Sequence, residues 1–140
     1  MQFYIYDFSE YLAYDVEANG FFAPYPHLDN YWEEPNTKFP YLISKDNKYV
    51  GFVLVKFIQS EQRSYFSIAE FFILKKYRLE GIGKSVAFHI FDLHRGQWEV
   101  FQRITNKPAQ IFWKKVIKEY SKGRFQERSE EGKEIQSFES

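Results

Sequence analysis

The stretch from Arg78 to Ser85, Arg-Leu-Glu-Gly-Ile-Gly-Lys-Ser, combines two closely spaced glycines with basic side chains. Glycine lets the backbone come close to a ligand, and a helix that begins after such a turn presents unpaired N–H groups to an anion. Arg78 and Lys84 add positive charge. The chemistry indicated is the binding of a phosphate group. The alternative interpretation is a plain turn before a helix.

Three phosphate-binding patterns can be compared with this turn. The Walker pattern, G-x-x-x-x-G-K-[ST], fits residues 83–85, but its first glycine would fall on Arg78. The dinucleotide pattern, G-x-G-x-x-G, fits Gly81 and Gly83, but Val86 stands in place of the third glycine. The pattern R-x-x-G-x-G at a strand-to-helix junction fits at every fixed position. The Walker and dinucleotide sites are therefore disfavoured, and the third pattern and a plain turn stay open.

Composition limits the classes of protein. The chain has 140 residues with 44% apolar and 21% aromatic content, which predicts one folded domain over residues 1–140. Lys plus Arg equals Asp plus Glu at 19 each, so the charge balance does not indicate nucleic-acid binding. Cysteine is absent, and His27, His89 and His94 are not at metal-ligand spacing, so we expect no metal. Apolar runs are short and no signal peptide is visible, so we expect no membrane contact and a cytoplasmic protein.

The elements that must position the turn follow from apolar periodicity and turn signals. An aromatic stripe of helical spacing begins at Tyr4, and a helix stop follows at Asn19-Gly20. Residues 21–40 hold four of the five prolines and predict a long loop with one helical turn. The remaining predicted elements, in chain order, are a hairpin at 41–44 and 48–58, a strand at 64–74, a helix at 84–95, a strand at 98–105, a helix at 106–123 and a hairpin turning at Glu131-Gly132.

This order predicts an α/β fold. Three strands in hairpin succession argue for a mixed but mostly antiparallel twisted sheet. The strand–helix–strand unit over residues 64–105 requires a parallel crossover, which places helices on the sheet faces. The predicted architecture is therefore a mixed, mostly antiparallel sheet flanked by helices.

Several segments together resemble the GNAT superfamily, the GCN5-related N-acetyltransferases. Residues 69–91, AEFFILKKYRLEGIGKSVAFHIF, resemble the family's fourth strand, pyrophosphate loop and third helix. Residues 106–120, NKPAQIFWKKVIKEY, resemble its fourth helix, and residues 48–55, KYVGFVLV, its third strand. The resemblance runs from about residue 40 to residue 140.

The resemblance implies that the turn holds the pyrophosphate of acetyl-coenzyme A, the co-substrate. Asn106 matches an asparagine that reaches the pantetheine or its phosphates, and its alternative role is a helix cap. Free backbone groups of the preceding strand would pair with the pantetheine arm as an added strand does. The residues implied in cofactor binding are Phe72, Ile73, Leu74, Arg78, Leu79, Glu80, Gly81, Ile82, Gly83, Lys84 and Asn106.

Two features depart from the family pattern. The family opens with a strand that is missing here, either because it is absent or because it was lost upstream. This leaves a sheet edge exposed or covered by a partner chain, and we expect a homodimer. The family's frequent general acid is a tyrosine at the position of Trp113, and an indole N–H donates a hydrogen bond but does not deliver a proton near neutral pH. Tyr31, Tyr120 or water could take that role, or the leaving thiolate needs no dedicated acid.

The reaction implied is acetyl transfer to a primary amine, which must first lose a proton. A glutamate at the position of Glu70 acts as the base in some relatives, so Glu70 and Trp113 are the candidate catalytic residues. Backbone N–H groups near Ile73 would polarise the thioester carbonyl. The alternative for Glu70 is a strand residue that faces solvent or pairs with Arg63 or Lys56.

Aromatic residues and carboxylates are interspersed in the first 34 residues, a combination that suits an ammonium group. We expect a cationic small molecule or a protein or peptide amine as acceptor, held by Tyr6, Asp7, Tyr31 and Trp32. The alternative is that these aromatics pack against the sheet while the acids stay solvated. A non-catalytic acetyl-CoA-binding domain, sensory or regulatory, is the competing function.

Overall fold

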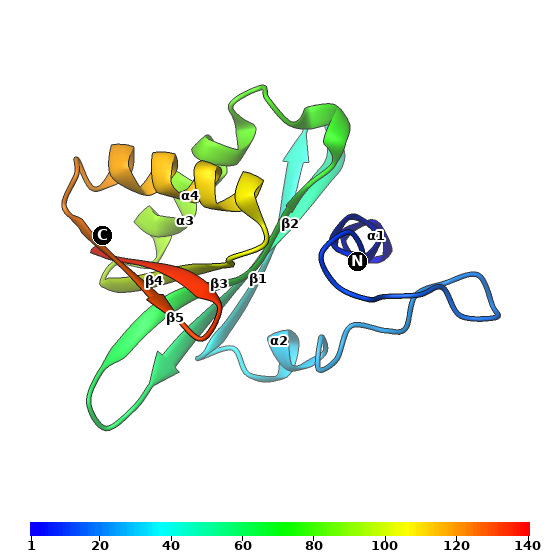
Figure 1. The fold of residues 1–140 in the computed structure, drawn as a ribbon, viewed down its shortest axis with the longest axis horizontal. Helices are drawn as coiled ribbons and strands as arrows, with labels where there is room; N and C mark the ends of the chain where they lie inside the picture. Colours follow the sequence, from blue (N-terminus) through cyan, green and yellow to red (C-terminus); the bar gives the residue numbers. More distant parts are fainter.

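Six strands form one mixed sheet in the order β1-β2-β3-β4-β6-β5 in the computed structural model, which describes residues 1–140 (Figure 1). Every neighbouring pair is antiparallel except β3 and β4, which run parallel. This confirms the predicted α/β class and the mostly antiparallel sheet. The strands are β1 (Lys38–Lys45), β2 (Lys48–Gln59), β3 (Ser64–Ile73), β4 (Gln97–Arg103), β5 (Phe125–Glu130) and β6 (Lys133–Glu139).

Both predicted hairpins are present, and their turn residues explain them. Asp46 and Asn47 join β1 to β2 with φ of 49° and 60°, and Glu131 and Gly132 join β5 to β6 with φ of 49° and 75°. Two consecutive residues of positive φ match the twist of a tight hairpin, and Asp, Asn and Gly adopt this region at low cost. The turns therefore fix the register of the sheet at its two edges, β1 and β5.

One face of the sheet carries the helices α3 (Ile82–Leu93) and α4 (Lys107–Tyr120), which lie side by side in Figure 1. Apolar side chains of both helices and of the strands β1 to β4 and β6 bury one continuous core here. Trp98 and Phe91 are fully buried at its centre. The apolar face predicted for residues 106–123 is confirmed, since Trp113, Val116 and Ile117 point into this core.

The opposite face is covered by α1 (Gln2–Phe8), where Tyr4 and Ile5 pack on Phe72 and Phe52. The helix was expected to run toward Asn19-Gly20, and this expectation is wrong, because α1 ends at Phe8. Beyond Phe8 the chain projects away from the sheet in Figure 1. A short helix depends on tertiary packing, and the buried residues of α1, Tyr4 and Ile5, both lie in its first half.

The loop expected over residues 21–40 contains the single helical turn α2 (Asn30–Glu33) as predicted. A short 3-10 turn, η1 (Lys75–Tyr77), links β3 to the glycine turn. No helix of the protein is long and apolar enough to span a membrane.

Candidate active site

A gap opens between the parallel strands β3 and β4. Their only paired residues are Phe66 and Trp98, near the start of both strands. On the other side of β3, the register with β2 shifts at Ala69, where Leu54 pairs with Glu70 and Val55 with Ile68. An extra residue of this kind bends the strand. The backbone edge of β3 that faces β4 is therefore free of ladder partners toward Ile73, as the family resemblance implied.

The glycine turn presents a run of free backbone donors. None of the six N–H groups from Leu79 to Lys84 donates a hydrogen bond within the protein. Leu79 and Gly81 have φ of 67° and 78°, and α3 begins directly after Gly81. Successive amides in such a turn, joined to a helix N-terminus, form a concave site for an anion. The turn has the donors that a pyrophosphate needs.

The charged side chains of the turn are engaged in holding it in place. Arg78 Nε donates to the carbonyl of Ile73 at 2.7 Å, and Arg78 Nη2 lies 2.5 Å from the Asp7 carboxylate. Lys84 pairs with Glu119 of α4 at 2.6 Å. Arg78 thus fastens the turn to β3 and α1. Because Arg78 and Lys84 are already paired, the free donors that the turn presents to a phosphate are its backbone amides.

The two glycines serve different purposes. A Cβ on Gly83 would lie 3.1 Å from the Phe112 ring, so Gly83 is needed for the packing of α3 against α4. A Cβ on Gly81 would meet nothing within 4 Å and would point into open space. We expected the missing side chain of each glycine to make room for a ligand. For Gly83 this is wrong, because its missing Cβ makes room for the Phe112 ring. Its backbone N–H remains among the six free donors.

Glu70 lies just past the bulge of β3, on the face covered by α1. The phenol of Tyr25 donates to its Oε1 at 2.6 Å, and the phenol of Tyr4 donates to its Oε2. Burial raises the pKa of the Glu70 carboxyl above its ordinary value of 4.5, and the two phenols, Lys56 and Arg103 offset part of this effect. Glu70 is thus a shielded carboxylate poised to accept a proton. Its alternative pairing with Arg63 is wrong, because Arg63 binds Glu99.

Tyr4 and Tyr25 were missing from the predicted site. They lie 66 and 45 residues from Glu70 in the sequence, and they belong to α1 and to the loop before α2. No local pattern links positions so far apart. The only signal in the sequence was the high density of tyrosine in the first 34 residues.

The four predicted acceptor residues are placed differently. Tyr31 is only 3% exposed, and its hydroxyl has no hydrogen-bond partner. Burial and the charge of Glu70 raise the pKa of this phenol. Asp7 is bound to Arg78 and Lys75, whereas Tyr6 and Trp32 are exposed. The structure therefore brings Tyr31 alone among these four close to Glu70.

Trp113 is buried on the opposite face of the sheet. Its ring packs edge-on against Phe71, with centroids 5.0 Å apart. Because Phe71 follows Glu70 in β3, their side chains lie on opposite faces, and Trp113 and Glu70 flank the same part of β3 from its two sides. Tyr120, the alternative acid, donates a 2.7 Å hydrogen bond to Asp92, and burial raises its pKa to about 12.

Asn106 is buried at the start of α4. Its Oδ1 accepts from Ala109 N at 3.1 Å, so the helix cap is confirmed. The amide Nδ2 remains available as a donor at the end of β4. A role toward the pantetheine stays a prediction.

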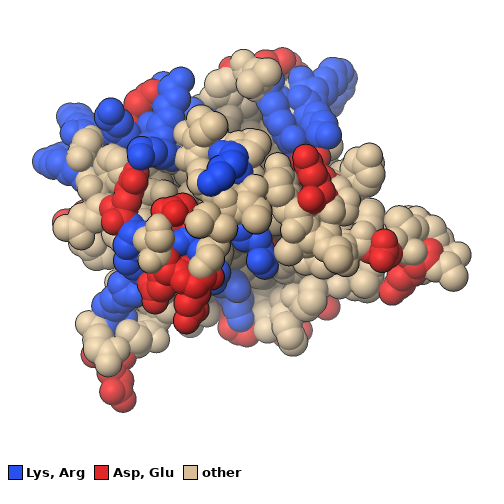
Figure 2. Space-filling model, in the orientation of Figure 1, with Lys and Arg blue, Asp and Glu red and all other residues tan.

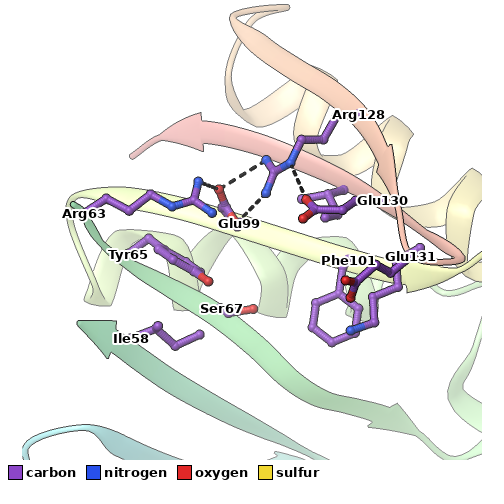
Figure 3. A pocket seen from close by; sticks show the side chains of 11 residues that line it. Ile58, Arg63, Tyr65, Ser67, Glu99, Phe101, Arg128, Glu130 and Glu131 are labelled. Carbon is purple, nitrogen blue, oxygen red and sulfur yellow. Dashed lines mark hydrogen bonds and ion pairs between the residues drawn. The ribbon is translucent and has the colours of Figure 1, made fainter. Parts of the chain in front are cut away.

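A groove of about 210 Å³ lies farther along the face of Glu70. Figure 3 shows Arg63 and Arg128 reaching the buried Glu99 from two sides. Arg128 makes a bidentate contact with Glu99, at 3.2 and 3.0 Å, and Arg63 donates to the same carboxylate. Arg128 also pairs with Glu130 at 3.1 Å, so two carboxylates balance the two guanidinium groups. The cluster joins β4 and β5 to the residue that precedes β3.

The first 37 residues, which we call the N-terminal arm, carry a one-sided charge. The arm holds seven acidic residues and no Lys or Arg, while the other 103 residues hold all 19 basic residues. In Figure 2 the projecting part of the arm shows red side chains and no blue ones. The arm supplies Tyr4 and Tyr25, whose phenols bond to Glu70, so a cation approaching Glu70 from this side meets negative charge.

Comparison with known families settles what kind of protein carries these features. Residues 5–117 match the model of the Acetyltransferase (GNAT) family, a match that includes the gap, the glycine turn and most of α4. The chain belongs to the GNAT acetyltransferase family. No curated protein sequence matches this GNAT protein.

Solved structures agree on the fold. Naa50 of Arabidopsis thaliana, bound to a bisubstrate analogue CoA-Ac-MVNAL, is 18% identical with a TM-score of 0.61, over 100% of this chain and 91% of Naa50. The PaiA N-acetyltransferase of Thermoplasma acidophilum, in complex with coenzyme A, is 12% identical with a TM-score of 0.60. That match covers 77% of this chain and 64% of PaiA, so this GNAT protein spans less than two thirds of it.

Proposed function

We propose that this GNAT protein transfers the acetyl group of acetyl-CoA to a primary amine. The observation that carries the proposal is the position of Glu70, a shielded carboxylate beside the gap between β3 and β4. The free amides of the glycine turn support acetyl-CoA as the donor, because they suit its pyrophosphate. The coenzyme A complexes of PaiA and of a Bacillus subtilis acetyltransferase of the same fold support the same donor.

The residues suggest how the transfer proceeds. Glu70 takes a proton from the ammonium group, which frees the nitrogen lone pair. The nitrogen attacks the thioester carbonyl, a C–N bond forms, and the C–S bond breaks. The second amine proton leaves the nitrogen as the coenzyme A thiolate departs, so the products are the amide and the free thiol. Trp113 forms the wall of the gap on the other face, and its indole N–H is a candidate donor to the sulfur.

The acceptor we favour is a cationic amine. The acidic N-terminal arm beside Glu70 supports this class, since opposite charge raises the local concentration of the substrate. Naa50 and Arabidopsis thaliana NAA60 were each solved with a bisubstrate analogue, and that of Naa50 carries a peptide. A peptide or protein amine is therefore a candidate alongside a small cationic molecule.

A second candidate is a non-catalytic acetyl-CoA-binding domain. The observation in its favour is that both oxygens of Glu70 already accept phenol hydrogen bonds. Trp113 in place of the family's frequent tyrosine points the same way. Both candidates predict binding of acetyl-CoA, and only the enzyme predicts turnover.

Two measurements separate the candidates. Calorimetry with acetyl-CoA and with ATP, run side by side, tests the donor, and we expect binding of acetyl-CoA alone. A panel of primary amines is then assayed for release of free coenzyme A thiol. Amine-dependent release supports the enzyme. Binding of acetyl-CoA without release on any amine supports the binding domain.

A further inference from the structure

Three tyrosines from separate elements converge on one buried carboxylate. Tyr4 of α1 and Tyr25 of the loop before α2 donate to Glu70, and Tyr31 of α2 completes the group. Tyr31 differs from the other two, because its hydroxyl is buried without any hydrogen-bond partner. A buried hydroxyl that bonds to nothing destabilises a protein, so its presence calls for an explanation.

We propose that the Tyr31 oxygen and Glu70 form the seat of the acceptor's primary ammonium group, and that this group displaces the phenol of Tyr25. The inference rests on the proposed function and deepens it. It assigns Tyr31 as a residue that determines specificity for the acceptor. Glu70 is the charged partner of the ammonium group, and Tyr25 is a side chain that blocks Glu70 until the acceptor displaces it.

Tyr25 rather than Tyr4 is the phenol that gives way. Both phenols pack against the apolar cluster of α1 and Phe72, but Tyr4 is buried within it and is held by a helix, whereas Tyr25 is only partly buried at its margin. Tyr25 lies in a segment where residues 23–26 make no backbone hydrogen bond at all. Segments with few such bonds open at low cost in free energy. Outward rotation of Tyr25 would free Oε1 of Glu70 on the side of the N-terminal arm, the segment that also carries the unpartnered hydroxyl of Tyr31.

A primary ammonium group fits the seat by its number of donors. It carries three N–H groups, and the opened site offers the two acceptors Oε1 of Glu70 and the Tyr31 oxygen. The neutral phenol of Tyr31 is maintained, since burial and Glu70 raise its pKa. A quaternary ammonium has the same charge and no donor, so it would leave both acceptors unsatisfied. Lys56 and Arg103 also face Glu70 and weaken the attraction of any cation equally.

The test compares Tyr31→Phe with the wild type and with Tyr49→Phe, a control at a phenol that is 74% exposed on β2. Thermal unfolding is recorded first. Tyr31→Phe should be at least as stable as the wild type, because it removes only an unsatisfied hydroxyl. A tyrosine retained for structural reasons would instead lose stability on this change.

Binding of two probes is then measured by NMR titration: butylammonium chloride and butyltrimethylammonium chloride. We expect the wild type and Tyr49→Phe to bind the primary ammonium at least about tenfold more tightly than the quaternary one, the factor of about 1.4 kcal/mol. Tyr31→Phe should reduce this ratio to near one. Tyr25→Phe should tighten butylammonium binding several-fold, because the side chain at position 25 then has no hydrogen bond to Glu70 that the ligand must break.

The outcomes also separate this inference from the proposed function. If butylammonium does not bind the wild type, or if Tyr31→Phe keeps the tenfold preference, the seat is wrong whether or not acetyl transfer occurs. If the preference depends on Tyr31 while no amine releases thiol from acetyl-CoA, the seat stands and the proposed enzyme activity fails.

Discussion

The phenol of Tyr25 donates a 2.6 Å hydrogen bond to Oε1 of Glu70, and this contact joins the acidic arm to the bulge of β3. The bond occupies one carboxylate oxygen of a residue whose burial raises its pKa. In the proposed mechanism Glu70 can act as the base only after Tyr25 moves. The proposal therefore couples access to Glu70 and binding of the acceptor through one side chain.

Glu70→Gln should lower turnover by about 100-fold or more at neutral pH, because the amide keeps the shape of the side chain but accepts no proton. The affinity for acetyl-CoA should stay the same, since Glu70 is not part of the glycine turn. Steady-state kinetics and calorimetry on the same preparation measure both quantities. Unchanged turnover would remove Glu70 from the chemistry.

The pH dependence of stability provides a second test of Glu70. Its pKa is raised in the folded state, so the folded protein holds this proton more tightly than the unfolded chain does. The resulting stabilisation is present below the ordinary pKa of 4.5 and is lost as pH rises through the folded-state value. The free energy of unfolding of the wild type, relative to Glu70→Gln, should therefore fall as the pH rises above 4.5. A relative stability that rises over this range would contradict the burial of this carboxyl.

Titration of the Glu70 carboxyl should also produce the acid limb of the pH dependence of kcat/KM. kcat/KM of the wild type should rise with pH through a value above 4.5, as Glu70 loses its proton. This limb should be absent in the residual activity of Glu70→Gln. An identical limb in both proteins would assign it to another group.

Binding of the pyrophosphate at the glycine turn can be tested with two variants of Gly81 that differ only in charge, because a Cβ at this position would point into open space. Asp and Asn both tolerate the positive φ of this position and have nearly the same shape. Gly81→Asp should weaken acetyl-CoA binding by about tenfold or more relative to Gly81→Asn, since its carboxylate repels the pyrophosphate, and the difference should shrink in high salt. Equal affinities of the two variants would place the pyrophosphate elsewhere.

Glu99→Gln should destabilise the protein by about 1–2 kcal/mol, because two guanidinium groups would lose a buried counter-charge while remaining partly solvated. The matched control is Glu127→Gln, which removes a solvent-exposed pair with Lys114 and should change stability by less than about 0.5 kcal/mol. Urea unfolding measures both. A cost no larger than that of the control would show that the cluster does not brace the sheet.

The free edge of the sheet at β1 leads us to expect that two copies of the protein associate. β1 pairs only with β2, and Leu42 on this strand is 70% exposed. We expect light scattering to show a homodimer, which Leu42→Lys should shift toward the monomer, since a lysine on an edge strand opposes pairing. A monomer at high protein concentration would exclude this association.

Local sequence signals predicted the regular part of the fold well. The turns at Asp46-Asn47 and Glu131-Gly132 depend on residues that tolerate positive φ, and the face of α4 at Trp113 and Ile117 has the period of a helix. Each of these features depends on residues that are close together in the sequence, so a local pattern is enough to predict it. The glycine turn and its free amides were predictable for the same reason.

The surroundings of Glu70 were predictable only in part. Glu70 and Tyr31 were identified, but Tyr4 and Tyr25 reach the carboxylate through tertiary packing that no local period encodes. The early end of α1 has the same origin, since the stripe from Tyr4 continues in the sequence beyond the sheet surface that stabilises it. The role of Gly83 likewise depended on Phe112, which lies on another helix.

Acetyl transfer with Glu70 as the base is tested by following thiol release and the acetylated product in one reaction of acetyl-CoA with a primary amine, for the wild type and Glu70→Gln. We expect the wild type to form one acetylated amine for each thiol released, and Glu70→Gln to bind acetyl-CoA equally well but to form product about 100-fold more slowly. Thiol release without an acetylated amine, or equal rates for the two proteins, would contradict it.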